Sequence, residues 1–342
     1  MSSKWRPQMQ TKMNFLYRTF VRCTFVFLSA ATCSTSFADD PFPSRPIKLI
    51  VPLAPGGATD TVTRIVGKQV SQILNTPVIV ENRIGAGGLI AMESMTKVNP
   101  DGYTLFVGNL STNALNQTVF AKKMKFKPED ELTGISILAT IPHILVSSAK
   151  LDAKDFKEMM AYIKANPKKV NHASPGVGTY SMIDMLTLEK AAGLDMTHIP
   201  YNGGAGQFLI PMVSNDVQIA FINASSVIEM IRAGNLRALA VTTEKRLPEL
   251  PNTPTMAELG YPGIGTNAWQ GLFAPKKTPP AVVSKIHAAV LEALKSDEVK
   301  EAFKKQLIVP VGSNTPEDFN QFIKSEVNRW ASVVKSINLP TE

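Results

Sequence analysis

The chain has 342 residues, of which 44% are hydrophobic and 19% are charged, and its formal net charge is +8. A chain of this length is expected to form two domains and can bury a large core. Beyond residue 38, no run of lysine and arginine residues with interleaved aromatic residues occurs, which argues against a nucleic-acid-binding protein.

The first 38 residues have the composition of a secretory signal peptide. Five basic residues and no acidic residue accompany an apolar stretch at 24–32, and Ser36 and Ala38 supply the small side chains expected before a cut after Ala38. The apolar stretch, about ten residues long, is too short to span a bilayer. We therefore expect residues 1–38 to be removed on export. Translation could start at Met1 or at Met13, and a start at Met13 gives a signal of ordinary length.

Removal of this segment changes the chemistry that is left in the mature chain. Cys23 and Cys33 both lie within it, so the remaining 304 residues contain no thiol, and the net charge falls from +8 to +3. Cys33 could mark a lipoprotein, but Thr32 is a poor residue directly before a lipidated cysteine. We expect a soluble mature protein without disulfides or thiol chemistry.

The residues after the signal alternate between short β-branched runs and helical periodicity, which predicts parallel strands flanked by helices. The first strand, at 47–52, leads through the turn sequence APGGATD into a helix from about Thr59, with Thr59 or Asp60 as its N-terminal cap. The other predicted elements of this first series are strand 78–80, helix 86–98 and strand 104–108.

A second series follows the long apolar stretch 135–147, which contains Pro142 and is expected to pass as a strand from one lobe to the other. The predicted elements of this series are helices 153–165, 181–192, 207–213 and 226–233 and strands 170–173, 198–201, 218–222 and 237–242. The proline-rich segment 247–262 is expected to be the return connection. Two amphipathic helices, 280–294 and 317–337, are expected to dock on the first lobe.

Two glycine-containing turns, APGGATD and SPGVGTY, each join a predicted strand to a predicted helix. Unpaired backbone N–H groups and the positive end of the helix dipole make such a turn a candidate anion site, although either can also be no more than a tight turn. APGGATD lacks P-loop and GxGxxG spacing, which argues against a nucleotide. Ser111 and Asn113 follow the third strand and are candidate polar contacts, because ligands bind at the carboxyl ends of strands.

Catalytic and metal sites find little support in the sequence. The four histidines have no HxxxH or HxH spacing and no GxSxG sequence is present, so we predict no metal, no cofactor and no enzymatic activity. A serine–histidine–aspartate arrangement assembled in space stays open as an alternative. Trp269 could stack on a ligand in a cleft or could belong to the core or to a hinge.

Seven sequence blocks in a fixed order resemble those of a known family. They are SRPIKLIVPLAPGGATDTVTRIV, VIVENRIGAGG, NPDGYTLFVGN, IPYNGGAG, LRALAVTTEKR, PTMAELGYPG and WQGLFAPKKTPPAVVSKI. From about Ser44 to Leu339 the chain resembles the Bug-type receptors of tripartite tricarboxylate transporters. The resemblance implies an α/β fold of the two-lobed periplasmic binding protein class, type II, and a location in the periplasm.

The resemblance also implies a ligand and a partner. A small carboxylate, such as a di- or tricarboxylate or an aromatic acid, is expected to bind between the lobes of a monomeric receptor that serves inner-membrane permease subunits. We expect lobe 1 to comprise 39–143 and 266–342 and lobe 2 to comprise 144–265. The expected ligand-binding residues are Ala58, Thr59 and Asp60 in the first turn, Gly178, Thr179 and Tyr180 in the second, and Ser111.

Departures from the family pattern bear on specificity. Phe221-Ile222-Asn223 stands where the family usually has Phe-Asp-Asn, so a carboxylate that could bind a ligand ammonium is missing and an amino-acid ligand is disfavoured. Tyr180 and Met182 make the second turn larger and less polar, which suits an aromatic or extended acid. Two other functions stay open: an exported hydrolase or isomerase that uses the same cleft, and a receptor that signals to a sensor kinase.

Overall fold

Two β-sheets that share one long strand organise residues 42–201 and 204–339, which are the residues described by this computed structural model. The shared strand is β4 (Leu132–Ser148), which pairs with β9 (Asn267–Pro275) as far as Pro142 and with β7 (Ile219–Asn223) from His143 onward. The predicted strand 135–147 is therefore present and is slightly longer than expected. The predicted signal peptide lies outside the described residues, as do Asn202 and Gly203.

The first sheet has the strand order β2-β1-β3-β9-β4, and its first three strands are parallel. Its remaining strands are β1 (Ile47–Val51), β2 (Val78–Asn82), β3 (Thr104–Asn109) and the short β10 (Val309–Pro310). β9 runs antiparallel to both β3 and β4, so this sheet is mixed and not purely parallel as the alternation predicted. β9 was not predicted, because eight of its nine residues are buried and its sequence therefore lacks the polar alternation of a half-exposed strand.

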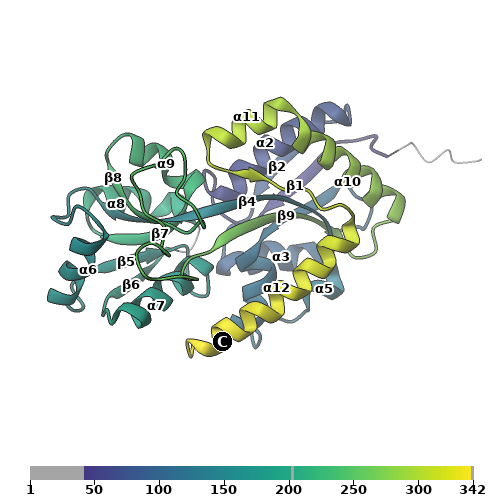
Figure 1. The fold of residues 1–342 in the computed structure, drawn as a ribbon. Coiled ribbons are helices and arrows are strands. Elements are labelled where there is room, and N and C mark those ends of the chain that lie inside the picture. The colour runs from purple at the N-terminus through teal and green to yellow at the C-terminus, as the bar shows by residue number, and fades with distance from the viewer. Residues whose placement is uncertain (1–41, 202–203, 340–342) are drawn as a thin grey trace, which may run out of the picture. The chain divides into compact units, whose positions relative to one another are not determined.

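Helices lie on both sides of this sheet, with α2, α10 and α11 on one side and α3, α5 and α12 on the other (Figure 1). Their bounds are α2 (Ala58–Ile73), α3 (Leu89–Met95), α5 (Pro128–Glu131), α10 (Pro280–Lys295), α11 (Asp297–Lys305) and α12 (Pro316–Ser336). The predicted helix 86–98 begins late, because Gly87 and Gly88 both have positive φ and form a separate turn, η1 (Ala86–Gly88).

The second sheet continues from β4 through β7, β5 and β6, and β8 pairs with β4. Its strands and helices are β5 (Asn171–Ser174), β6 (Thr197–Pro200), β8 (Leu236–Val241), α6 (Phe156–Ala165), α7 (Tyr180–Ala192), η3 (Ala205–Gln207), α8 (Leu209–Ser214) and α9 (Ala224–Arg232). A separate apolar core lies under this sheet and includes Phe156, Leu188 and Phe221. All eight predicted elements of this series are present, with bounds that differ by at most three residues.

The predicted C-terminal helices pack on elements of the first sheet. α10 contacts α2 and β4, and α12 contacts β4 and the π-helix η2 (Ser111–Leu115), which runs into α4 (Asn116–Val119). Trp269 is 1% exposed and its indole N–H donates to Glu326 Oε2 on α12 at 3.0 Å, so it belongs to the core and does not line a cleft. Within the described residues, no helix combines the length and the apolar character needed to cross a membrane.

Candidate functional site

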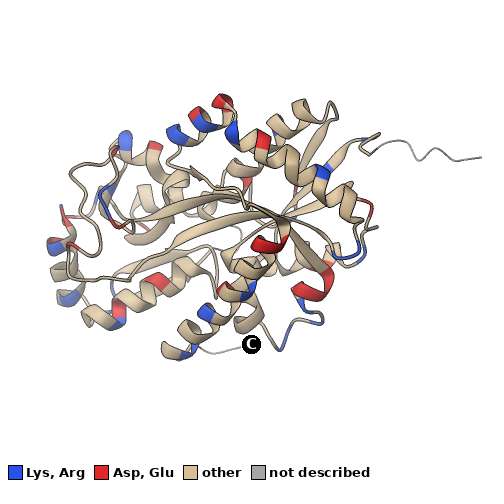
Figure 2. Ribbon diagram, turned by 45° about the vertical axis from the view of Figure 1, so that its right-hand side comes forward, with Lys and Arg blue, Asp and Glu red and all other residues tan. Residues whose placement is uncertain are grey.

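A small cavity of about 40 Å³ lies where the N-termini of α2 and α7 face each other. The first sheet's elements contribute Ala58, Thr59 and Ser111 to its wall, and the second sheet's elements contribute Thr179 and Tyr180. None of the described residues that line it is Lys, Arg, His, Asp or Glu. Figure 2 shows that the charged residues lie mainly on helices and loops at the outside of the chain. Five of the seven expected ligand-binding residues thus meet at one cavity.

α2 begins at the cavity without a side-chain cap. Its N-cap is Gly57, so the helix starts earlier than predicted, and Thr59 and Asp60 lie within the first turn. The preceding Gly56 has φ +80°, a left-handed conformation that glycine adopts without strain. This turn leads the chain directly into the helix and leaves the first N–H groups without a capping oxygen.

α7 also begins at the cavity without a bond from its own N-cap side chain, although its first N–H group, that of Tyr180, donates to Ser111 Oγ. Its N-cap residue is Thr179, but the Thr179 hydroxyl donates to the Gly176 carbonyl at 2.8 Å and does not cap the helix. α9 is a third uncapped helix at the cavity, and its N-cap Asn223 is part of the wall. Side chains do cap α6, α11 and α12, through the oxygens of Asp155, Ser296 and Thr315. Partial positive charge from three helix dipoles therefore converges on a wall whose described residues carry no charged side chain.

The Asp60 side chain does not line the cavity. Its carboxylate accepts hydrogen bonds from Gly56 N–H (3.0 Å), Arg64 Nε (2.9 Å) and Asn82 Nδ2 (2.9 Å). Burial alone would raise the pKa of Asp60, but these bonds from Arg64, Gly56 and Asn82 outweigh it and hold the pKa below its usual value. The carboxylate therefore braces the turn, and its charge is balanced by Arg64.

Thr59 is held by two buried partners that the sequence did not identify. Its hydroxyl donates to Gln270 Oε1 at 2.7 Å and accepts from Asn109 Nδ2 at 3.1 Å. Gln270 and Asn109 are 0% and 1% exposed and lie on β9 and β3. The first turn of α2 is thus fixed to the end of β3 and to the middle of β9.

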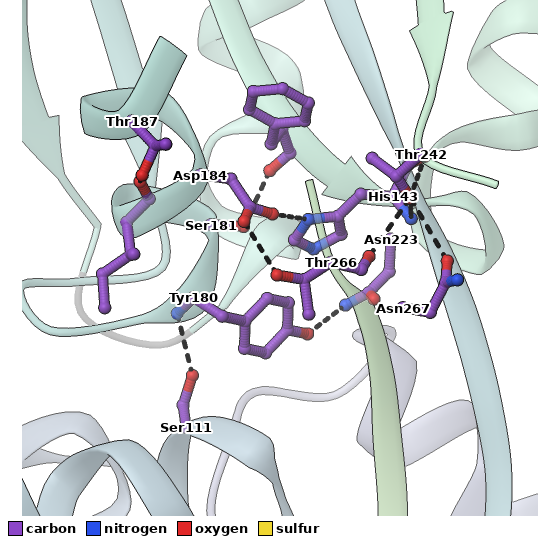
Figure 3. Close-up of polar contacts among 12 residues, drawn as sticks. Ser111, His143, Tyr180, Ser181, Asp184, Thr187, Asn223, Thr242, Thr266 and Asn267 are labelled. Carbon is purple, nitrogen blue, oxygen red and sulfur yellow. Dashed lines mark hydrogen bonds and ion pairs between the residues drawn. The ribbon is translucent and has the colours of Figure 1, made fainter. Parts of the chain in front are cut away.

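The second turn approaches the first sheet's elements closely. Gly178 does not line the cavity; it has φ +76°, and a Cβ there would lie 2.6 Å from Val119 Cγ1. The next contact is a hydrogen bond from Tyr180 N–H to Ser111 Oγ at 3.2 Å, drawn in Figure 3. Asn113, the other candidate after the third strand, lies outside the cavity, and its Oδ1 accepts from the Thr112 hydroxyl.

The histidines lie outside the cavity wall, and His143 is buried whereas His198 is half-buried. His143 Nδ1 contacts Asp184 Oδ2 at 2.7 Å, and His198 Nε2 contacts Ser174 Oγ at 2.7 Å. Ser174 is fully buried and also bonds the Gly176 carbonyl, so this serine does not face the cavity as a nucleophile would. Among the described residues, no three His, Cys, Asp or Glu side chains form a group that could hold a metal ion.

Comparisons with known proteins agree with this arrangement. The sequence model of the "Tripartite tricarboxylate transporter family receptor" family matches residues 62–339. Protein BugT of Bordetella pertussis is 35% identical over 91% of this chain and 94% of its own length. Two solved structures confirm the two-lobed binding-protein fold. The periplasmic binding protein BugD is 28% identical to this chain, with a TM-score of 0.83, and the match covers 88% of this chain and 100% of BugD. MatC from Rhodopseudomonas palustris with bound malate is 32% identical, with a TM-score of 0.80, and the match covers 86% of this chain and 100% of MatC.

Proposed function

Because the chain belongs to the tripartite tricarboxylate transporter receptor family, we propose that it binds the carboxylate of a small organic acid between α2 and α7 for delivery to inner-membrane permease subunits. The observation that carries this proposal is the convergence of three uncapped helix N-termini on a cavity without charged side chains in its described wall. Unpaired N–H groups at a helix start are natural partners of an anion. The malate bound to MatC supports the same ligand class.

The proposed ligand-binding residues are Ala58, Thr59, Ser111, Thr179 and Tyr180, which line the cavity, with Asp60 and Gly178 shaping the two turns. Backbone N–H groups would carry the carboxylate, and side chains would select the rest of the acid. Ligand pockets are usually hundreds of Å³ in volume. A cavity of about 40 Å³ therefore has to widen, and we propose that the lobes part to admit the acid and close again around it.

The change of strand pairing in β4 supports the proposed lobe division. β4 pairs with β9 as far as Pro142 and with β7 from His143 onward, one residue before the proposed boundary between 143 and 144, which supports a crossing there. The return crossing is proposed at 265 and 266, just before β9. Lobe 1 would then be 39–143 with 266–342, and lobe 2 would be 144–265.

We propose binding without catalysis. General acid–base chemistry needs a titratable group within hydrogen-bonding reach of the reacting atom, and Tyr180 is the one titratable side chain among the described residues of the wall. Burial raises the pKa of Tyr180 well above its usual value, although the Asn223 hydrogen bond opposes this rise, so the phenol stays protonated. Family relatives in the comparisons are likewise solute-binding proteins.

A panel of acids tests the proposed function. Thermal shift and calorimetry with malate, adipate, citrate and benzoate should reveal saturable binding of at least one acid, since a ligand that binds only the folded state raises its stability. Adipamide is the matched control, because it keeps the length of adipate and lacks the charge. Equal binding of adipate and adipamide, or binding of no acid, would contradict the proposal. Turnover of a bound acid would favour an enzyme instead.

A further inference from the structure

A buried polar network connects the proposed site to the point where the two sheets meet. At this point, called the crossing here, β4 exchanges hydrogen bonds with the residues that follow β8 and precede β9. His143 N–H donates to Thr242 Oγ1 (2.9 Å) and to the Thr266 carbonyl (3.2 Å), and Thr242 N–H donates to the His143 carbonyl (3.1 Å). His143, Thr242 and Thr266 thus tie three chain segments together.

α7 reaches the crossing through one carboxylate. Asp184 Oδ2 contacts His143 Nδ1 at 2.7 Å, and Asp184 Oδ1 accepts from the Thr266 hydroxyl at 2.7 Å (Figure 3). His143, Asp184 and Thr266 are 0%, 5% and 6% exposed. Both carboxylate oxygens are therefore engaged, one by β4 and the other by the residue directly before β9, which restrains α7 relative to these two segments.

Tyr180 lies on the same face of α7, one turn before Asp184, because residues four apart on a helix are neighbours. Its ring stacks on the His143 ring with a centroid separation of 4.7 Å and an interplanar angle of 27°. Its hydroxyl accepts from Asn223 Nδ2 at 2.7 Å, and its backbone N–H reaches Ser111. One residue of the proposed site is thus held from behind by His143 and at its tip by Asn223.

Packing alone does not require a charged group at this position. A buried carboxylate–histidine pair rarely stabilises a fold more than an apolar pair of the same volume, because both groups lose their hydration. Within the described residues, His143 Nε2 has no hydrogen-bond partner although it is buried, which adds to the cost of the pair. Hydrogen bonds do, however, fix direction more strictly than apolar contact does.

We propose that His143 and Asp184 are positioning residues of the binding site: they fix Tyr180, and with it the N-terminus of α7, relative to the crossing. This inference rests on the proposed function. Because the crossing is where the lobes would hinge, the pair holds the carboxylate-binding turn in one orientation during closure. The affinity for an acid therefore depends on two side chains that do not line the cavity.

The test compares Asp184→Leu, which keeps the branched outline of the side chain and removes both hydrogen bonds, with Asp184→Asn, which can form both. Deuterium uptake by the backbone of 178–185 is measured without ligand, and adipate and malate affinities are measured by calorimetry. Asp184→Leu should increase the uptake and weaken binding about tenfold or more, whereas Asp184→Asn should restore most of both. Glu189→Leu is the matched control, since Glu189 lies on the same helix and bonds Met196 N–H, away from Tyr180.

A second arm separates positioning from stability. The double variant His143→Phe with Asp184→Leu replaces the pair by apolar groups and keeps a ring against Tyr180, so it covers the case in which Asp184→Leu alone fails to fold. Wild-type uptake and affinity in this double variant would overturn the proposal. In a Tyr180→Ala background, Asp184→Leu should weaken binding less than it does in wild type, because the Tyr180 ring is one of the groups through which the pair acts; fully additive losses would also overturn the proposal. Should wild-type protein bind neither acid, the proposed ligand class fails, while the uptake comparison still decides the positioning role.

Discussion

Ser111 and Tyr180 join the two sides of the cavity through one hydrogen bond, in which Tyr180 N–H donates to Ser111 Oγ at 3.2 Å. The same N–H group is one of the donors proposed for the ligand carboxylate. Ser111 and the carboxylate therefore compete for one donor. Both residues of this hydrogen bond are buried, since Ser111 is 6% exposed and Tyr180 is 7% exposed.

Removal of this bond should loosen the closed arrangement. We expect Ser111→Ala to increase the radius of gyration of the protein without ligand, because one bridging hydrogen bond, worth about 1 kcal/mol, is lost. Small-angle scattering measures this, with the exposed Ser325→Ala as control. Identical scattering profiles for Ser111→Ala and wild type would show that the bond does not hold the lobes together.

Gly178→Ala should weaken acid binding strongly. The new methyl group would meet Val119 at 2.6 Å and push the second turn away from the cavity. Gly193→Ala is a matched control, because Gly193 also has positive φ (+63°) at the other end of α7 but has no atom within 4 Å of the added Cβ. Both variants should lose about 1 kcal/mol of stability from backbone strain. Calorimetry should detect a large loss of affinity in Gly178→Ala alone, and equal losses would count against a role for the second turn.

The protein should lose stability in mild acid through His172. Burial, followed by the nearby His198, lowers the pKa of His172 to about 3 from 6.5. Protonation then favours the unfolded chain, so the free energy of unfolding falls as pH drops below 6.5, by about 1 kcal/mol between pH 7.5 and 5.5. Burial of Glu189 raises its pKa and opposes part of this loss. Urea midpoints at both pH values should differ less in His172→Phe than in wild type, and an unchanged difference would exclude His172 as the cause.

Glu326→Leu should destabilise the protein without changing acid binding. Glu326 Oε2 accepts from the indole N–H groups of both Trp269 (3.0 Å) and Trp330 (3.2 Å), and Glu326 is 6% exposed. Two buried donors would lose their acceptor, at a cost of about 2 to 4 kcal/mol. Urea unfolding followed by tryptophan fluorescence measures the loss, and the exposed Glu317→Leu on the same helix is the control. Weaker acid binding in Glu326→Leu would place α12 in the site after all.

The mature chain isolated from the periplasm should begin at Asp39, because Ser36 and Ala38 match the residues that signal peptidase recognises. Intact-mass spectrometry distinguishes this form from a chain that begins at an acylated Cys33. A mass that includes a lipid group on Cys33 would show that the receptor is anchored to a membrane and is not soluble.

Local periodicity was sufficient to predict most elements around the site. α7 was expected at 181–192 and spans Tyr180–Ala192, and the turn before it was identified from its glycines alone. Each of these features depends on residues close together in the chain, which is why a sequence pattern reveals them.

The contacts that hold the site in place could not be predicted in this way. Thr59 and Gln270 lie 211 residues apart in the chain, and His143 and Asp184 lie 41 apart. β9, which carries Gln270, was itself missed because it is buried on both faces. The direction in which the Asp60 carboxylate points could also not be predicted from the sequence, since it depends on a hydrogen bond from Asn82 in a neighbouring strand.

The uncapped starts of α2 and α7 have an evolutionary consequence. A main-chain N–H group is present whatever side chain a codon specifies, proline excepted, so point mutations rarely remove an anion clamp made of such groups. Other side chains of the wall, such as Ile222 and Ser226, can vary while the proposed clamp is inherited intact. A receptor of this design can thus acquire a new acid by changing a few wall residues, without first losing its hold on the carboxylate.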